Sequence, residues 1–226
     1  MTLTIAVITN KTNLNTVFLD RLKFGDELLI EYSKDNLKSF AEKRNLALKK
    51  SKGDWILFVD DDEIISRELA SEIKQAIKES NHSGYFLRRS DVVFGQELKH
   101  GEVGNIKILR LAKKNSGEFK RDVHEVWDIN GKIGTLNNRI YHVKDNFISQ
   151  FISRISFYGP IDAQSLNSEG KPFSYFKLFA FPVAKFIQSY FFKKGFLDGY
   201  VGLFLAYLMS IQSLSVRVFQ WEKQTS

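Results

Sequence analysis

The chain has 226 residues, enough for one large domain or for one domain with an appendage. Hydrophobic residues make up 43% of it and aromatic residues 14%, which supplies a packed core and excludes a generally disordered chain. Cysteine is absent, so disulfides and thiolate metal sites are excluded. The net charge of +7 fits an anionic partner, whether nucleic acid, the phosphates of a nucleotide or an anionic membrane surface.

The first 80 residues alternate between predicted strands and predicted helices. Apolar, partly β-branched runs predict strands over residues 3–9, 27–32 and 55–59. Helical spacing predicts helices over residues 13–22 and 36–50, and a third that Ser66 caps. This alternation predicts an α/β fold with a mostly parallel sheet. Because the N-terminus resembles a strand and not a secretory signal, we expect the protein on the cytoplasmic side.

Further strands are predicted before residue 145, and the composition changes after it. The later strands are expected over residues 85–89, 106–111, 123–129 and 139–143, with glycine-bearing connections between them. Beyond this point aromatic and aliphatic residues dominate, with lysines among them. We therefore predict two regions, an α/β domain over residues 1–145 and a hydrophobic, basic, helical region over residues 146–226.

The C-terminal region contains two apolar helical patterns. Between Phe176 and Phe191 the apolar residues follow the spacing of an amphipathic helix, which Pro182 interrupts. Residues 199–216 carry no charge, and this run of 18 is slightly short of the roughly 20 needed to cross a bilayer. One membrane span, a pair of interfacial helices, an oligomer-forming hairpin and simple packing on the α/β domain all fit. Aromatic residues beside basic ones favour helices that lie in the membrane surface.

An acidic cluster follows the buried strand in the stretch WILFVDDDEII, residues 55–65. On an extended strand end, Asp60 and Asp62 project to the same side while Asp61 points away. Two carboxylates this close repel by roughly 4 kcal/mol at an effective dielectric of 20, so solvent, a basic side chain, a shared proton or a divalent cation must offset the repulsion. Oxygen ligands of this kind suit Mg²⁺ or Mn²⁺ together with the phosphates of a substrate. A solvated acidic turn is the alternative, but the strand before and the helix after favour a metal–diphosphate site.

Several motifs in order along the chain resemble family 2 glycosyltransferases of the GT-A fold. They are Asp60-Asp61-Asp62 for the Asp-x-Asp motif, EKRNLAL at residues 42–48, KHGEVGNIKILRL at 99–111, DVHE at 122–125 and KKGFLDG at 193–199. The chain looks most like the branch that includes the lipopolysaccharide inner-core β-1,4-glucosyltransferases. The resemblance implies a Rossmann-like GT-A domain with a mostly parallel, mixed sheet flanked by helices, followed by an amphipathic helical membrane-associating extension.

The resemblance also implies roles for particular residues. Glu125 matches the general base that deprotonates the acceptor hydroxyl, and His124 orients it or contacts phosphate. His142 reaches the metal, with Asp60 and Asp62, or the diphosphate. Nucleotide-binding positions are Thr9, Asn10, Lys11, Glu31, Arg44, Asn45, Asp60, Asp61 and Arg110. His100 is expected in a loop on the acceptor side.

Two segments depart from the family pattern. Thr9-Asn10-Lys11-Thr12 replaces the Lys-Asn-Glu that usually ends the first strand. The usual Asp-x-Gly-Ser-x-Asp loop after the second strand is missing, and Glu31-Tyr32-Ser33 stands in its place. About one strand and one helix of the nucleotide-binding half are therefore absent relative to the family, which leaves base recognition open.

The motifs together predict a metal-dependent, inverting glycosyltransferase at the cytoplasmic face of the cell membrane. It would move a hexose from a nucleotide sugar, expected to be a UDP-sugar, to a glycolipid or cell-envelope glycan such as lipopolysaccharide core. Nucleic acid is not expected as a partner, because the basic residues are dispersed. The alternatives are a nucleotidyltransferase and a catalytically degenerate membrane-binding module of the same fold.

Overall fold

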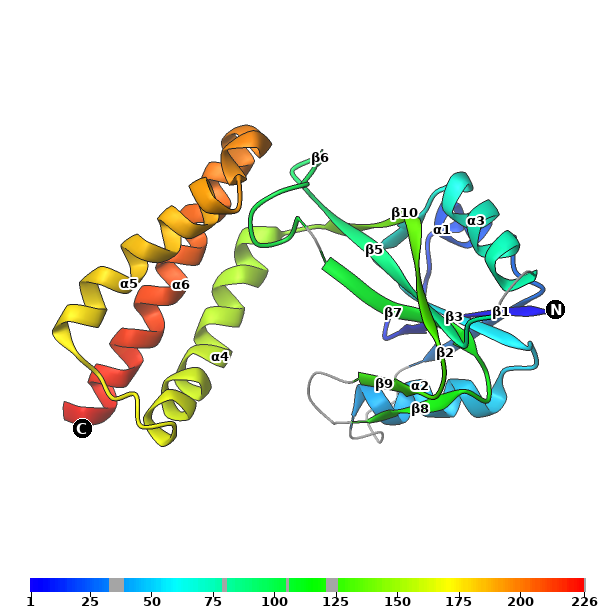
Figure 1. Cartoon of the computed structure of the whole chain (residues 1–226), viewed down its shortest axis with the longest axis horizontal. Coiled ribbons are helices and arrows are strands. Elements are labelled where there is room, and N and C mark those ends of the chain that lie inside the picture. Colours follow the sequence, from blue (N-terminus) through cyan, green and yellow to red (C-terminus); the bar gives the residue numbers. More distant parts are fainter. Residues whose placement is uncertain (33–38, 79–80, 105, 121–125, 226) are drawn as a thin grey trace. The chain divides into compact units, whose positions relative to one another are not determined.

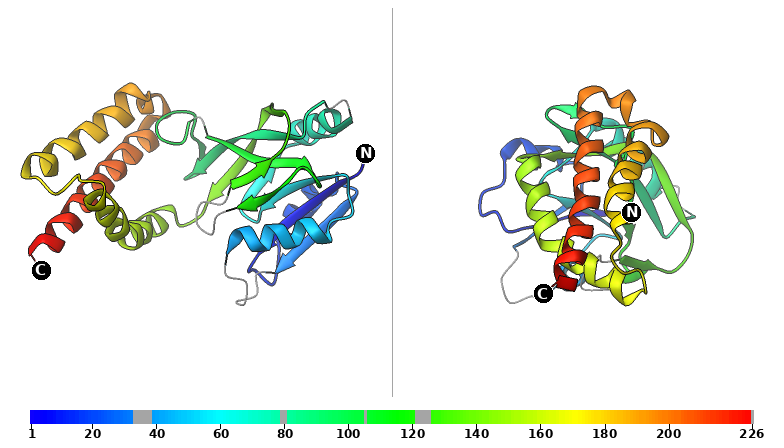
Figure 2. Two further views of the ribbon diagram at one scale, coloured as in Figure 1. Left: turned by 60° about the horizontal axis from the view of Figure 1, so that its bottom comes forward. Right: turned by 90° about the vertical axis from the view of Figure 1, so that its left-hand side faces the viewer.

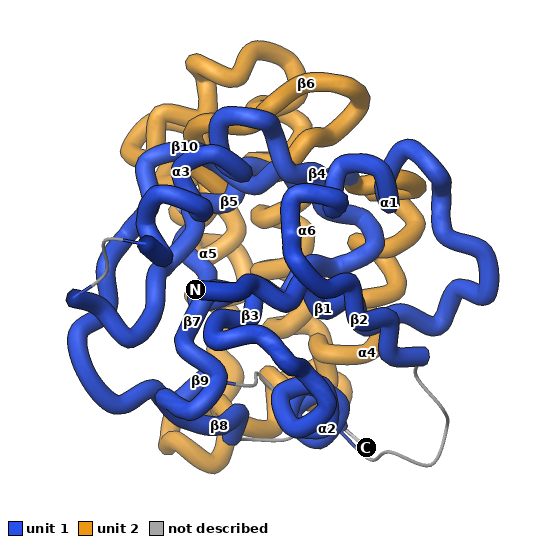
Figure 3. Tube along the Cα trace, turned by 90° about the vertical axis from the view of Figure 1, so that its right-hand side faces the viewer, with its two compact units in different colours: residues 1–90, 106–143 blue, residues 91–105, 144–226 orange. Residues whose placement is uncertain are grey.

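A computed structural model describes residues 1–32, 39–78, 81–104, 106–120 and 126–225 of the chain. The chain divides into two compact units (Figure 3). The first consists of Met1–Ser90 and Ile106–Val143, and the second of Asp91–Asn105 and Lys144–Ser226. The second unit therefore combines the C-terminal helices with an earlier segment, from which residues 106–143 of the first unit separate them in the sequence.

A mixed sheet forms the centre of the first unit (Figure 1). β1 (Leu3–Thr9) pairs in parallel with β2 (Glu27–Tyr32) on one side and with β3 (Trp55–Asp60) on the other. β7 (Ile106–Lys113) lies antiparallel between β3 and β5 (Gly84–Val93). β10 (Ile133–Lys144) follows β5 in the sheet and is antiparallel to β4 (Glu63–Ile65).

Helices and a two-stranded sheet cover the two faces of the central sheet. Successive side chains of a strand point to opposite faces, so β1 and β3 contribute to both hydrophobic cores. On one face Ile5 and Leu57 pack with α1 (Thr16–Arg21) and α3 (Arg67–Lys78). On the other face Ala6 and Phe58 pack with α2 (Phe40–Lys50), β8 (Gly117–Lys120) and β9 (Val126–Ile129).

The predicted α/β fold with a mixed sheet is confirmed. Fewer strand pairs are parallel than the sequence predicted. Among the pairs described, only those of β1 with β2 and with β3 are parallel. The later strands of the sheet pair antiparallel, as in β3–β7, β5–β7 and β4–β10. The predicted cap is also confirmed, since the Ser66 hydroxyl accepts a hydrogen bond from the Leu69 amide in the first turn of α3.

The second unit contains three long helices, α4 (Phe147–Ser168), α5 (Tyr175–Ile187) and α6 (Gly199–Thr225), which lie side by side in Figure 2. A π-helical turn (Gln188–Phe192) and a 3-10 turn (Gly195–Asp198) lead from α5 to α6. The earlier segment adds β6 (Gln96–Glu97), which pairs with the end of β5. Val93, Leu98 and Phe147 form the core of this unit, with apolar residues of α6 packed against them.

The C-terminal helices leave much apolar surface exposed. By length and composition, Gly195–Gln224 is a helix apolar enough to cross a membrane, the only one of this kind in the part of the chain that the structure describes. Only 22% of its most apolar window is buried inside the protein. The predicted apolar C-terminal helix is therefore present.

Candidate active site

The four acidic residues 60–63, here called the acid turn, connect β3 with β4. β3 is buried up to Val59 and ends at Asp60, and Asp61 and Asp62 then form a turn. The Asp60 amide donates a hydrogen bond to Glu63 Oε2 at 2.9 Å, which closes the turn. The expectation that Asp60 and Asp62 share one side of an extended strand is therefore wrong, because the backbone leaves the strand at Asp61.

Asp60 points to the face of the sheet that α2 covers, and two arginines hold its carboxylate. Arg110 of β7 donates to Oδ2 at 2.5 Å, and Arg44 of α2 donates to Oδ1 at 3.3 Å. Burial opposes ionisation of Asp60, but the Arg110 and Arg44 charges outweigh it and hold the pKa of this carboxyl below its usual value. The two arginines are themselves almost buried. Asp60, Arg44 and Arg110 therefore form one charge cluster, as their predicted shared role requires.

Asp61 turns to the end of β1. Its carboxylate accepts a hydrogen bond from the Thr9 hydroxyl and forms an ion pair with Lys11 at 2.8 Å. The Thr9 hydroxyl also accepts from the Lys11 amide at 3.0 Å. Asn10, between them, is exposed. The predicted positions at the end of β1 thus lie beside the acid turn, where the carboxyl ends of adjacent parallel strands meet.

Asp62 lies beside His142 of β10. The imidazole Nε2 is 3.0 Å from Asp62 Oδ2, and the Val143 amide donates to the Asp62 carbonyl at 2.9 Å. His142 is in register with Glu63 across the β4–β10 pair, so the short strand β4 brings the histidine to the acid turn. The sequence pattern did not predict β4, whose three residues are too few to show a period of their own.

Glu63 is the buried member of the acid turn, with 1% of its surface exposed. Burial and the nearby Asp60 charge raise the pKa of Glu63 to about 7. Its carboxyl accepts the hydrogen bond of the Asp60 amide inside the turn. The sequence motifs assign Glu63 no role of its own. An acid three residues after a strand end, followed by apolar residues, is the signal that it closes the turn.

Two predicted nucleotide-binding residues have their side chains bonded elsewhere. The Asn45 amide accepts from the Phe119 backbone N–H at 2.8 Å and donates to the Phe119 carbonyl at 2.9 Å, so it joins α2 to β8. The Glu31 carboxylate pairs with Lys50, at the end of α2, at 2.7 Å. Glu31 still lies near the site, because Ile8 is the register partner of both Glu31 and Asp60.

Of the three remaining predicted residues, His100, His124 and Glu125, the structure describes only His100. His124 and Glu125 lie outside the described residues. His100 belongs to the second unit, where its Nδ1 is 2.9 Å from Asp198 Oδ1. Asp198 also accepts hydrogen bonds from the Lys99 and His100 amides, so it fixes the backbone beside the imidazole.

No group of three or more acidic or histidine side chains in the described ranges has the geometry of a metal site. Asp60 faces two arginines, which already balance its charge. Asp62 and His142 together offer a carboxylate oxygen and an imidazole nitrogen, with 45% and 15% of their side chains exposed. This donor pair fits a divalent cation that takes its other ligands from diphosphate oxygens and water.

Fold and site together define an α/β protein whose acidic cluster lies at the carboxyl ends of the strands, where such sheets bind their ligands. The sequence model of glycosyl transferase family 2 matches residues 18–136, more than half of the chain. The protein therefore belongs to glycosyl transferase family 2, and the predicted family and GT-A class are confirmed. The narrower lipopolysaccharide branch stays a prediction.

Curated relatives of the chain are named as glycosyltransferases. An uncharacterized glycosyltransferase of Rickettsia typhi is 28% identical over 178 residues, covering 73% of this chain and 59% of the relative. An uncharacterized glycosyltransferase of Rickettsia felis is 30% identical over 182 residues, which cover 73% of this chain and 61% of the relative. The chain thus spans about three fifths of the length of the curated relatives it matches.

Solved structures resemble the chain more distantly. S. aureus TarS 1–349 in complex with UDP-GlcNAc gives a TM-score of 0.47 at 16% identity, covering all of this chain and 92% of that one. The bifunctional IspDF from Campylobacter jejuni gives a TM-score of 0.38 at 13% identity, covering 62% of this chain and 50% of that one. Likenesses at this level assign no ligand to the present chain.

Proposed function

We propose that this family 2 enzyme is an inverting, metal-assisted hexosyltransferase. It uses a UDP-sugar and transfers the hexose to a glycolipid or cell-envelope glycan, such as lipopolysaccharide core, at the cytoplasmic face of the cell membrane. The observation that carries the proposal is the acid turn with its surrounding cations. Three carboxylates and the cations Arg44, Arg110 and Lys11 meet at the carboxyl end of β3, next to His142.

The charges of this cluster suit a nucleoside diphosphate. Each of the two buried arginines has guanidinium donors of the kind that bind phosphate oxygens, and Asp60 orients both. Asp62 and His142 would hold the divalent cation, and the imidazole favours Mn²⁺ over Mg²⁺ there. A bound cation would neutralise the leaving diphosphate. The sequence predicted Asp60, Asp62 and His142 as metal ligands, and the present proposal keeps Asp62 and His142 and leaves out Asp60.

Glu125 is proposed as the general base, on the match of DVHE to the family motif. An inverting transfer needs a carboxylate that accepts the proton of the acceptor hydroxyl during a single displacement. Replacing Glu125 with Gln keeps the size of the side chain and removes the base. We expect Glu125→Gln to abolish transfer while UDP binding persists, and an active variant would refute the role.

Membrane association is proposed from the second unit. Large apolar side chains on the outer faces of α5 and α6 are exposed, including Phe176, Phe179, Tyr200 and Phe204. Large exposed apolar patches mark surfaces that a partner or a membrane covers. An enzyme that acts on a lipid-linked acceptor would need such contact.

The test is a donor screen by nucleotide release, with Mn²⁺, with Mg²⁺ and with chelator. We expect release from a UDP-sugar with Mn²⁺, and thermal stabilisation of the protein by UDP plus Mn²⁺. Asp62→Asn should lose the Mn²⁺ dependence, while Asp128→Asn, on the exposed β9 strand, should not. If no nucleoside diphosphate stabilises the protein with either metal, the chain is instead a binding module without activity.

A further inference from the structure

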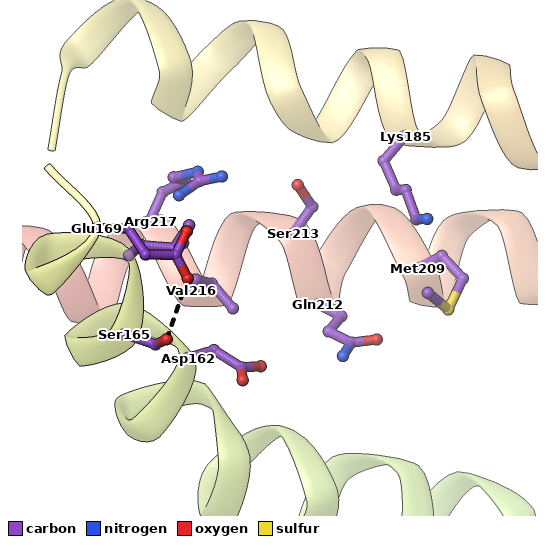
Figure 4. Close-up of a pocket in the computed structure, with 10 residues that line it drawn as sticks. Asp162, Ser165, Glu169, Lys185, Met209, Gln212, Ser213, Val216 and Arg217 are labelled. Atoms are coloured by element: carbon purple, nitrogen blue, oxygen red, sulfur yellow. Dashed lines mark hydrogen bonds between the residues drawn. The ribbon is translucent and has the colours of Figure 1, made fainter. Parts of the chain in front are cut away.

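The three helices of the second unit line an open cleft that the proposed sugar transfer does not use. It lies between α4 and α5 on a floor formed by α6, and its volume is about 410 Å³. This is within the range of roughly 300–1,000 Å³ for small-molecule sites. Figure 4 shows the side chains that face it, of which Asp162, Glu169, Lys185 and Arg217 are charged and Ser165, Gln212 and Ser213 are polar.

Arg217 is a cation without an acidic partner in this cleft. Its Nη1 donates to Gln220 Oε1 at 2.7 Å, and the guanidinium lies 4.7 Å from the centre of the Phe181 ring. Its Nε is buried without a hydrogen-bond partner among the described residues. A partly buried guanidinium in this state is costly, and an anion that accepts from it would offset the cost.

Of the other charged residues of the cleft, two form ion pairs and one does not. Glu169 pairs with Lys171 at 2.9 Å, and Lys185 pairs with Glu102 at 2.8 Å. Asp162 forms no ion pair with a described residue. The cleft therefore presents one uncompensated guanidinium and one uncompensated carboxylate. This combination fits a ligand with an anionic group and a hydrogen-bond donor.

The faces of the same helices that point away from the cleft are apolar. On α6 an exposed residue recurs every three or four positions, and we call this set the α6 stripe: Tyr200, Phe204, Tyr207, Ile211, Leu214, Val218 and Trp221. At 1.5 Å per residue it extends over about 32 Å, close to the roughly 30 Å of a hydrocarbon core. Aromatic residues lie at both ends, as in helices that contact lipid.

Polar bonds on the inner side join these helices. Gln220 is fully buried, and its amide donates to Asn167 Oδ1 at 2.9 Å and to the Lys171 carbonyl at 3.0 Å. The Ser210 hydroxyl donates to the Pro182 carbonyl at 2.8 Å. Polar contacts inside and apolar side chains outside are typical of helices surrounded by lipid. A helical unit with apolar outer faces and a charged cleft suits a surrounding of membrane lipids, which have apolar chains and polar headgroups.

We propose that the cleft between α4, α5 and α6 binds the phosphoester headgroup of a membrane lipid. Arg217 binds the phosphate, and Asp162 accepts a hydrogen bond from a hydroxyl or ammonium group of the same headgroup. The proposal rests on the membrane association proposed above and is independent of the sugar transfer. It gives the second unit a lipid-selective role beyond general attachment to a surface.

The test compares binding of the full chain to two kinds of vesicle, one of equimolar phosphatidylethanolamine and phosphatidylglycerol, the other of phosphate-free galactolipid. We expect the chain to prefer the phospholipid vesicles on the order of 10-fold, the effect of one charge-assisted hydrogen bond. Arg217→Gln should remove this preference. The matched control Arg154→Gln, which removes an exposed charge from α4, should keep it. Equal losses in both variants would show that surface charge alone acts, and the proposal would be overturned.

A second variant covers the case in which Arg217→Gln fails to fold, as judged by circular dichroism. Ser213→Leu fills the cleft without a change of charge, and it too should lose the preference. If glycerol 3-phosphate in solution binds as tightly as the vesicles, the ligand is a soluble phosphoester and not a lipid. If the chain ignores vesicles and sediments as a dimer that Leu214→Glu dissociates, the α6 stripe is a seam between two copies. Each of these two results would overturn the proposal.

Discussion

Asp60 Oδ2 and Arg110 Nη2 are 2.5 Å apart, so β7 supplies the nearest counter-charge to the carboxylate at the end of β3. We expect Arg110→Met to lower kcat/KM on the order of 10- to 100-fold, because it removes one of the guanidinium groups proposed to bind the diphosphate. Nucleotide release measures the effect. Lys107→Met removes an exposed charge from the same strand and is the control. If the two variants were equally active, Arg110 would have no specific role in the site.

The buried carboxyl of Glu63 makes stability depend on pH. Because its pKa is raised from 4.5 to about 7, the folded protein retains a proton that the unfolded chain releases. This contribution, about 3 kcal/mol in total, is complete below pH 4.5 and is lost as the pH rises to about 7. The lowered pKa of Asp60 acts in the opposite direction, at more acidic pH.

Glu63→Gln should therefore remove the fall in the free energy of unfolding between pH 5 and 7. Urea denaturation in the presence of a chelator measures it, and the exposed Glu118→Gln is the control. A wild-type protein with equal stability at pH 5 and pH 7 would contradict the raised pKa of Glu63.

The amide of Asn45 is expected to act on stability and not on nucleotide affinity. Asn45→Ala leaves the N–H and carbonyl of Phe119 without their side-chain partner, at a cost of about 1–3 kcal/mol in the free energy of unfolding. Denaturation and UDP titration would be measured side by side. Unchanged stability with weaker UDP binding would restore the nucleotide role that the motif predicts.

Glu102 links the segment 91–105 to the helices of the second unit. Its carboxylate accepts from Lys185, Lys193 and Ser189. Although burial acts against ionisation, these three bonds lower the pKa of Glu102 to about 2. The stabilisation is therefore present above pH 4.5 and is lost as the pH falls towards 2.

Glu102→Gln should accordingly reduce the free energy of unfolding by about 1–3 kcal/mol at pH 7, and the difference from wild type should shrink below pH 4. Thermal denaturation across this pH range provides the measurement, with the exposed Glu222→Gln as control. A difference that is independent of pH would mean that the packing, and not the charge, of Glu102 matters.

The sequence alone predicted those elements whose apolar residues show a clear period. β2 lies over the predicted residues 27–32, and β3 extends the predicted run by Asp60 alone. β1 and β3 carry continuous apolar runs because both of their faces are buried, under α1 and α3 on one side and α2 on the other. The acidic residues that follow β3 identified the site for the same reason, since a buried strand must end before charges begin.

Only the tertiary structure decided which side chains meet. Asp60, Asp61 and Asp62 are neighbours in sequence, yet they face β7 and α2, the end of β1, and β10 respectively. Likewise Asp198 and His100, 98 residues apart, form one hydrogen-bonded pair in the second unit. Periodicity reports which face of an element is buried, but it contains no information about the distant residue that supplies a charge or a hydrogen bond. Those partners are fixed by strand order and register, which long-range packing determines.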